Sequence, residues 1–117
     1  MGHFLLSMRH GEPPADVAAD MPQIMADIDA FGERLKADGQ WVYGGGLKPV
    51  ETAQIIDGTG PDTVVTDGPF PEAKEHLGGF WIIDAPSHSD AMTIAAEASR
   101  VSRLPLEVRE FHAEPPE

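Results

Sequence analysis

The segment from Asp67 to Gly79 holds the densest group of side chains that could carry acid–base chemistry. Acidic, basic and imidazole groups fall together there, in a stretch expected to connect two strands. Asp67 could act as a general base and His76 as an acid or a base, provided that burial tunes their pKa values. Both are therefore candidate catalytic residues. The candidate ligand-binding residues of this segment are Asp67, Phe70, Lys74 and Glu75.

The same segment has a structural interpretation, to which the sequence alone gives more weight. Asp67 would then accept hydrogen bonds from the turn amides that follow it. Phe70 would fill the core, and Lys74 and Glu75 would be solvated. A long loop with ionisable groups beside a rigid sheet is also a common place for a site, so both interpretations stay open.

His10 and Trp81 complete the set of candidate residues. His10 ends the first expected strand, where a cleft between sheet and helices could open, and it is the third candidate catalytic residue; a surface histidine is the alternative. Trp81 is a candidate ligand-binding residue because it belongs to a group of strand aromatics that could line a pocket. Aromatic residues in strands more commonly serve as core or interface. The group is Trp41, Tyr43, Phe80 and Trp81.

The remaining motifs favour neither a metal nor a cofactor. The chain has no cysteine, which excludes thiolate catalysis and cysteine metal sites. His3 and His112 lie on terminal strands without a third ligand, and neither HExxH nor EF-hand spacing occurs. The Gly44 to Gly46 run lacks the GxGxxG spacing, and we interpret it as a bulge or a close backbone approach.

Composition and charge indicate one small acidic domain over residues 1–117. The formal net charge is −12, from 20 acidic and 8 basic residues. Such a surface repels a phosphate backbone, so nucleic acid is rejected as the main partner. No apolar run is long enough for a membrane span or a signal peptide, so we expect a cytoplasmic protein.

The elements that must position these residues alternate between strand and helix. The apolar stripe on every third or fourth residue predicts an amphipathic helix from about Asp20, and Gly39 closes it. Ser87 is predicted to cap a second helix, with Asp90 three residues on. Asp67 to Gly79 is expected to be a loop. The expected strands are His3 to Arg9, Gln40 to Tyr43, Thr52 to Ile56, Thr63 to Thr66, Phe80 to Asp84 and Leu106 to His112.

This order predicts an α+β, ferredoxin-like βαβ-βαβ fold with an inserted β-hairpin. Two helices can cover only one face of its sheet, yet the strand from Phe80 to Ile83 is apolar on both faces. The uncovered face would expose a large hydrophobic patch. We therefore expect a homodimer in which two sheets pack face to face.

The run Val65 to Phe70, with Lys74-Glu75 and Leu77 to Gly79 downstream, resembles the signature of the DGPF proteins in the YCII-related group. The resemblance implies a dimeric α+β barrel in a bacterial protein, and genes of this type often lie beside extracytoplasmic-function sigma factors. His76 stands where the family usually has Gln. The broader group has a candidate active-site His on the first helix and an Asp-Pro after the second, and neither is present here.

The favoured hypothesis is a small-molecule-binding protein with a cleft between sheet and helices. One alternative is a cofactor-independent acid–base enzyme, with isomerase or lactone chemistry, by analogy with other dimeric α+β barrels. Another is a regulatory interaction module linked to a sigma factor, which the gene neighbourhood of the resembling family suggests.

Overall fold

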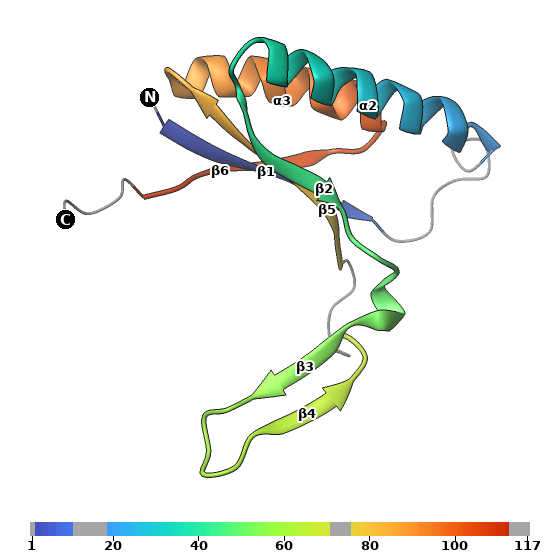
Figure 1. Ribbon diagram of the computed structural model, residues 1–117, viewed down its shortest axis with the longest axis vertical. Coiled ribbons are helices and arrows are strands. Elements are labelled where there is room, and N and C mark those ends of the chain that lie inside the picture. The colour runs from blue at the N-terminus through green and yellow to red at the C-terminus, as the bar shows by residue number, and fades with distance from the viewer. Residues whose placement is uncertain (1, 11–18, 71–75, 113–117) are drawn as a thin grey trace.

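The computed structural model of the protein describes residues 2–10, 19–70 and 76–112 (Figure 1). Its elements follow the order that the sequence predicts. They are β1 (Gly2–His10), α2 (Met21–Ala37), β2 (Trp41–Gly46), a 3-10 turn (Val50–Thr52), β3 (Gln54–Asp57), β4 (Val64–Asp67), β5 (His76–Ala85), α3 (His88–Ser102) and β6 (Leu106–Glu110).

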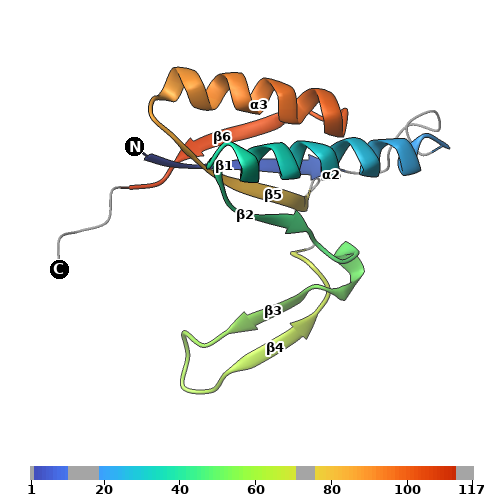
Figure 2. The same ribbon diagram turned by 45° about the horizontal axis from the view of Figure 1, so that its top comes forward.

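Four of the strands form one antiparallel sheet in the order β2-β5-β1-β6. Each half of the chain contributes a strand, a helix and a strand, and the two halves interleave, which is the ferredoxin-like arrangement. Both helices lie on the same face of this sheet (Figure 2). The predicted α+β fold, with its two helices covering a single face, is confirmed.

The core fills the space between the helices and the sheet. Phe4, Leu6 and Ile83 extend from the central strands and are buried. From α2, Leu35 is fully buried, and the ring of Phe31 meets Trp81 edge-on at 5.3 Å between centroids. The apolar stripe predicted from the sequence is therefore the core-facing side of α2; its first member, Val17, lies outside the described residues.

Helix α3 begins as its sequence predicts. The Ser87 hydroxyl accepts a hydrogen bond from the Asp90 N–H at 3.1 Å and donates one to the Asp90 carboxylate at 2.8 Å. This satisfies an amide that would otherwise have no partner at the helix start. The buried side of α3 is rich in alanine, which lets the helix lie close to the sheet.

The prediction of a loop from Asp67 to Gly79 is wrong at its C-terminal end. Strand β5 already begins at His76, and the Cα partner of His76 across the ladder is His10. The register of β1 and β5 shifts between Met8 and Arg9, so a bulge absorbs the extra residue. Glycines have low strand propensity, which is why Gly78 and Gly79 concealed this part of the strand.

Strands β3 and β4 pair only with each other in a separate two-stranded sheet. We call residues 54–67 the arm, because they project away from the four-stranded sheet (Figures 1 and 2). The Gly68 N–H donates to the Ala53 carbonyl at 2.7 Å and closes the base of the arm. The hairpin predicted from the sequence is confirmed, with its large apolar side chains exposed: Ile56, Val64 and Val65.

The face of the four-stranded sheet turned away from the helices, called here the open face, is both apolar and charged. At its centre, Ile82 of β5 is the Cα partner of Leu5 on the neighbouring strand β1 and of Tyr43 on the other neighbouring strand, β2. Arg9 and Glu107 form an ion pair at 3.3 Å near the β6 edge. Over the described ranges, neither helix has the length and apolar character needed to cross a bilayer.

Candidate functional site

A pocket of about 630 Å³ lies between α2 and the β2–β5 side of the sheet. Aliphatic and aromatic side chains form most of its wall, and a run of glycines forms part of its floor. Its described lining includes Met8, Met21, Ile24, Met25, Ile28, Gly32, Trp41, Gly44, Gly45, Gly46, Gly78, Phe80, Trp81, Ser102 and Leu104.

The glycines let backbone and aromatic rings come unusually close. A Cβ atom added at Gly44 would lie 2.9 Å from Trp81 Cδ1 and 3.0 Å from the Phe80 carbonyl oxygen. One added at Gly32 would meet the ring of Trp41 at 3.4 Å. The sequence-based interpretation of Gly44 as a close backbone approach is confirmed, and the bulge in β2 falls just before it, between Trp41 and Tyr43.

Three ionisable side chains of α2 line the pocket together with its apolar wall: Asp29, Glu33 and Lys36. The Lys36 ammonium lies 4.8 Å from the ring centroid of Trp41, within the range of a cation–π contact. It also lies 3.4 Å from a carboxylate oxygen of Glu33. The carboxylates of Asp29 and Glu33 are therefore available as acceptors for the polar groups of a bound molecule.

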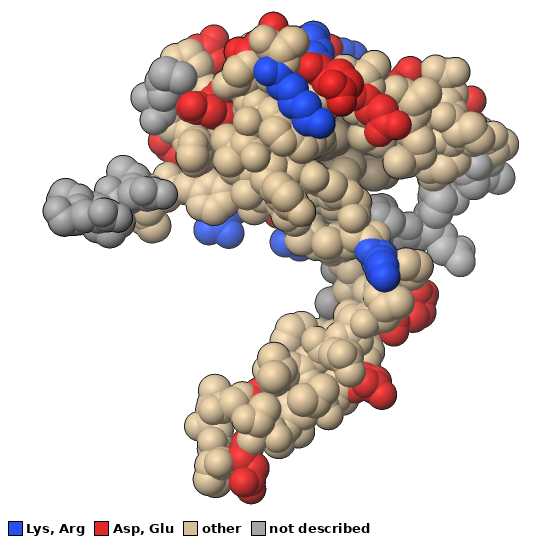
Figure 3. All heavy atoms as spheres, viewed as in Figure 1, with Lys and Arg blue, Asp and Glu red and all other residues tan. Residues whose placement is uncertain are grey.

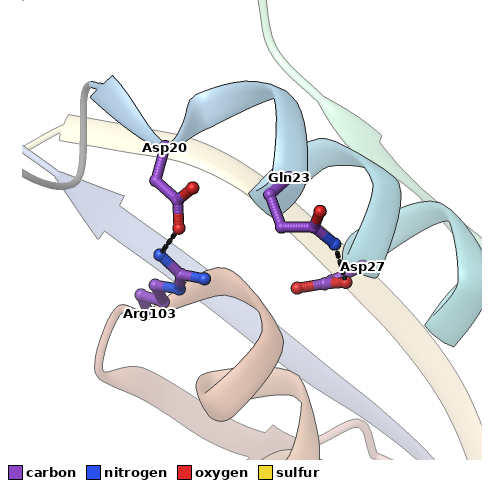
Figure 4. Close-up of polar contacts among 4 residues, drawn as sticks. All are labelled: Asp20, Gln23, Asp27 and Arg103. Atoms are coloured by element: carbon purple, nitrogen blue, oxygen red, sulfur yellow. Dashed lines mark hydrogen bonds and ion pairs between the residues drawn. The ribbon is translucent and has the colours of Figure 1, made fainter.

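An ion pair ties the start of α2 to the end of α3 at one end of the pocket (Figure 4). Arg103, the C-cap of α3, donates to the carboxylate of Asp20. Arg103 holds a left-handed backbone conformation with φ of 60°. Met21 and Leu104, the neighbours of these two residues, line the pocket, so the ion pair helps to fix the spacing of its wall.

The structure places the candidates from the loop apart from this pocket. Asp67 ends β4 in the arm, where it accepts a hydrogen bond of 3.0 Å from the side-chain amide of Gln54. Phe70 is 59% exposed, so the interpretation that it fills the core is wrong for a single chain. Lys74 and Glu75 lie outside the described residues.

The other candidates lie in the four-stranded sheet. His10 and His76 are Cα partners, and Met8 and Gly78, each two residues nearer the middle of its strand, line the pocket. The ladder thus pairs the backbones of these two residues near one end of the pocket, while Asp67 belongs to a different sheet. Trp81 is buried and lines the pocket itself.

Sequence reasoning missed the helix side of the pocket. Met21 and Ile28 belong to the apolar stripe predicted from the sequence, whereas Met25, which lies beside that stripe and widens its apolar surface, was not singled out. A stripe wider than the core requires, with a glycine at position 32, is the signal that could have revealed it. Of the four candidate strand aromatics, Trp41 and Trp81 line the pocket, whereas the ring of Phe80 lies beside Tyr43 on the open face and its carbonyl oxygen lies near Gly44.

Two further observations concern the titratable groups. The pKa of Asp57 is lowered, because the hydroxyl and then the backbone N–H of Thr59 donate hydrogen bonds to its carboxylate at the tip of the arm. Among the residues that the structure describes, no three potential metal ligands gather at one place.

The interleaved topology and the pocket beneath the first helix define a ferredoxin-like α+β protein with room for a ligand. More particularly, the chain belongs to the family of the YCII-related domain, whose sequence model matches residues 6–111. The resemblance inferred from the sequence is thereby confirmed.

The chain is similar to a protein of Rhizobium meliloti (strain 1021) that is described as uncharacterised. The two are 31% identical over 80 residues, which cover 68% of this chain and 64% of the relative. Among solved structures it is similar to the 5-chloro-2-hydroxyhydroquinone dehydrochlorinase of Burkholderia phenoliruptrix AC1100 in complex with 2,5-dihydroxybenzoquinone. The TM-score is 0.52 at 20% identity, covering 96% of this chain and 95% of that one, so the similarity extends to the fold.

Proposed function

We propose that the protein binds a small, mainly apolar ring compound in the pocket between α2 and the sheet, and that it does so as a homodimer. The observation that carries the proposal is the pocket itself. Its volume of about 630 Å³ falls in the range of small-molecule sites, and such sites combine an apolar wall with a few polar groups.

The lining supports a hydroxylated aromatic ligand. Trp41 and Trp81 offer ring faces and edges for a flat molecule, and the thioethers of Met21 and Met25 can adapt to its outline. At the polar side of the pocket, carboxylates outnumber the one described cation, Lys36. Hydroxyl groups that donate to these carboxylates fit better there than a strongly anionic group. The dehydrochlorinase of similar fold also binds a six-membered ring compound with oxygen substituents, 2,5-dihydroxybenzoquinone.

The open face supports the dimer. Leu5, Phe80 and Ile82 lie on it without a covering layer among the residues that the structure describes, and Tyr43 is 62% exposed. Sheet-to-sheet packing with a second copy buries this surface.

The test of binding uses two methionines of matched exposure. Met25 lines the pocket and is 48% exposed, whereas Met92 on α3 is 45% exposed and outside the described lining. Met25→Trp fills the pocket, so its affinity for hydroquinone, whose hydroxyl groups are un-ionised at neutral pH, should fall at least about 10-fold in titration calorimetry. Met92→Trp should retain the wild-type affinity. Binding that is unchanged in Met25→Trp, or lost equally in both variants, would contradict the assignment.

A second candidate function is acid–base catalysis on the same ligand, and the pairing of His10 with His76 beside the pocket favours it. A histidine there could move a proton to or from a ring hydroxyl. His76→Gln should then abolish turnover while ligand affinity is preserved. If turnover by this variant matches wild type, His76 has no role in proton transfer.

A further inference from the structure

We propose that the arm, residues 54–67, grips a second copy of this chain: it passes the β6 edge of the partner's sheet and buries its apolar side chains there. The inference deepens the proposed function, because it assumes the homodimer and states what the arm does within it. Four observations carry it.

The first observation is that the arm has no stabilising neighbour among the described residues of its own chain. Its two strands pair only with each other, and Ile56 is 71% exposed. Val65, the Cα partner of Ile56, and Val64 beside it are each 56% exposed. An isolated two-stranded hairpin is marginally stable in water, so these side chains need a covering surface.

The second observation is the amount of surface that the chain leaves uncovered. Its accessible area is 8381 Å². A compact monomer of 12.6 kDa exposes about 6,200 Å², so the excess is about 2,200 Å². The Cα radius of gyration is 16.5 Å, against about 13 Å for a compact chain of this length. Each side of a standard protein interface buries about 800 Å², so the excess is more than one stable dimer interface requires.

The third observation is charge complementarity. The arm carries three aspartates and no basic residue: Asp57, Asp62 and Asp67. On the open face, Arg9 of β1 is already paired with Glu107, whereas Arg109 of β6 has no ion pair among the described residues. Figure 3 shows basic side chains on the underside of the body, where it faces the acidic arm across a gap. A second copy placed in this gap brings opposite charges together.

The fourth observation is geometric. When two open faces meet across a two-fold axis parallel to the strands, β6 of one copy lies beneath β2 of the other. The arm leaves the body directly after β2, so it descends past the β6 edge of the partner. From Gln54 to the turn at Gly60 it can extend about 23 Å, which exceeds the spacing of about 10 Å between packed sheets. The β6 edge is also where Arg109 lies.

The first experiment measures hydrogen exchange across the arm of the full-length protein as a function of protein concentration. We expect amides of residues 54–67 to become protected over the same concentration range in which light scattering detects the dimer. Rapid exchange at every concentration would overturn the proposal. So would protection at concentrations where light scattering detects only the monomer, because the arm would then pack on its own chain.

The second experiment places one positive charge on the arm and measures the dimer dissociation constant by analytical ultracentrifugation. Ile56→Lys puts an ammonium group into the buried contact, so the constant should rise about 30-fold. Ala30→Lys, which adds the same charge on the exposed side of α2, is the matched control and should leave the constant unchanged. A constant for Ile56→Lys equal to that of the control would overturn the proposal.

Tyr43→Lys tests the sheet-to-sheet contact independently of the arm, because Tyr43 lies on the open face. Since its side chain is exposed, the substitution should not disturb the fold. If only Tyr43→Lys weakens the dimer, the sheets pack together and the arm proposal fails. If only Ile56→Lys weakens it, the arm binds the partner and the face-to-face packing in the proposed function fails. A monomer at all concentrations overturns both.

Discussion

Gly44 is the residue at which the pocket and the core constrain each other most directly. Its missing side chain leaves room for the edge of Trp81 and for the Phe80 carbonyl, so the pocket floor can run close to the aromatic wall. From the sequence, three consecutive glycines indicated either a bulge or a close backbone approach. Which glycine makes the approach depends on the register of β2 against β5, and a pattern of three identical residues does not specify that register.

Substitution by alanine should distinguish these glycines. Gly44→Ala places a Cβ inside contact distance of Trp81, so we expect a loss of about 1–3 kcal/mol in the free energy of unfolding. At Gly45 an added Cβ meets nothing within 4 Å, so Gly45→Ala should change stability by less than about 0.5 kcal/mol. Urea unfolding of both variants checks the difference. Equal losses would mean that strand propensity, rather than crowding, sets the cost.

The helices and strands were predicted well where the sequence contains a local signal for them. The stripe of α2 and the Ser87 cap of α3 are local signals, and both are confirmed. The start of β5 was missed because His76 to Gly79 has neither alternation nor β-branched residues, and its strand structure comes from pairing with β1. The helix side of the pocket was missed for a similar reason: Met25 reads as a surface residue until the sheet defines the opposite wall.

The junction between α2 and α3 allows an element-scale prediction about Arg103. Its left-handed backbone conformation is unfavourable for a residue other than glycine, and its side chain forms an exposed ion pair with Asp20. Arg103→Gly loses the ion pair, worth at most about 1 kcal/mol, and relieves the strain, so stability should change little. Arg103→Ala loses the pair and keeps the strain, so it should be about 1 kcal/mol less stable than the glycine variant. Chemical denaturation that ranks alanine above glycine would contradict this account.

The tip of the arm should respond to acid through Asp57. Hydrogen bonds from Thr59 lower the pKa of this carboxyl in the folded arm. A lowered pKa means that the stabilising contribution is present above the ordinary carboxyl pKa and is lost as the pH falls through the lowered value, in the region below about pH 4. Exchange of the Thr59 amide, followed by NMR, should accelerate in that range. Asp57→Asn should abolish this pH dependence, and a persistent dependence would assign it to another carboxyl.

At the scale of the whole molecule, the order of the elements in the sequence predicts the topology. Two strand-helix-strand units in one chain have few antiparallel arrangements, and β2-β5-β1-β6 is the ferredoxin-like one. The position of the arm was beyond prediction, because a hairpin pattern specifies how two strands pair and says nothing of where the pair points. Phe70 illustrates this limit: its apolar character suggested the core, and its exposure follows from the direction of the arm.

The segment that connects β2 to the arm is joined to the pocket wall by a hydrogen bond from the Leu47 N–H to the Gly78 carbonyl at 2.9 Å. Gly46 and Gly78, at this junction, both belong to the pocket lining. If a second subunit holds the arm as proposed, it should therefore stiffen the same backbone that a ligand would contact. Because thermodynamic coupling is reciprocal, a molecule that enters the pocket should tighten subunit association by the same factor by which association raises its own affinity.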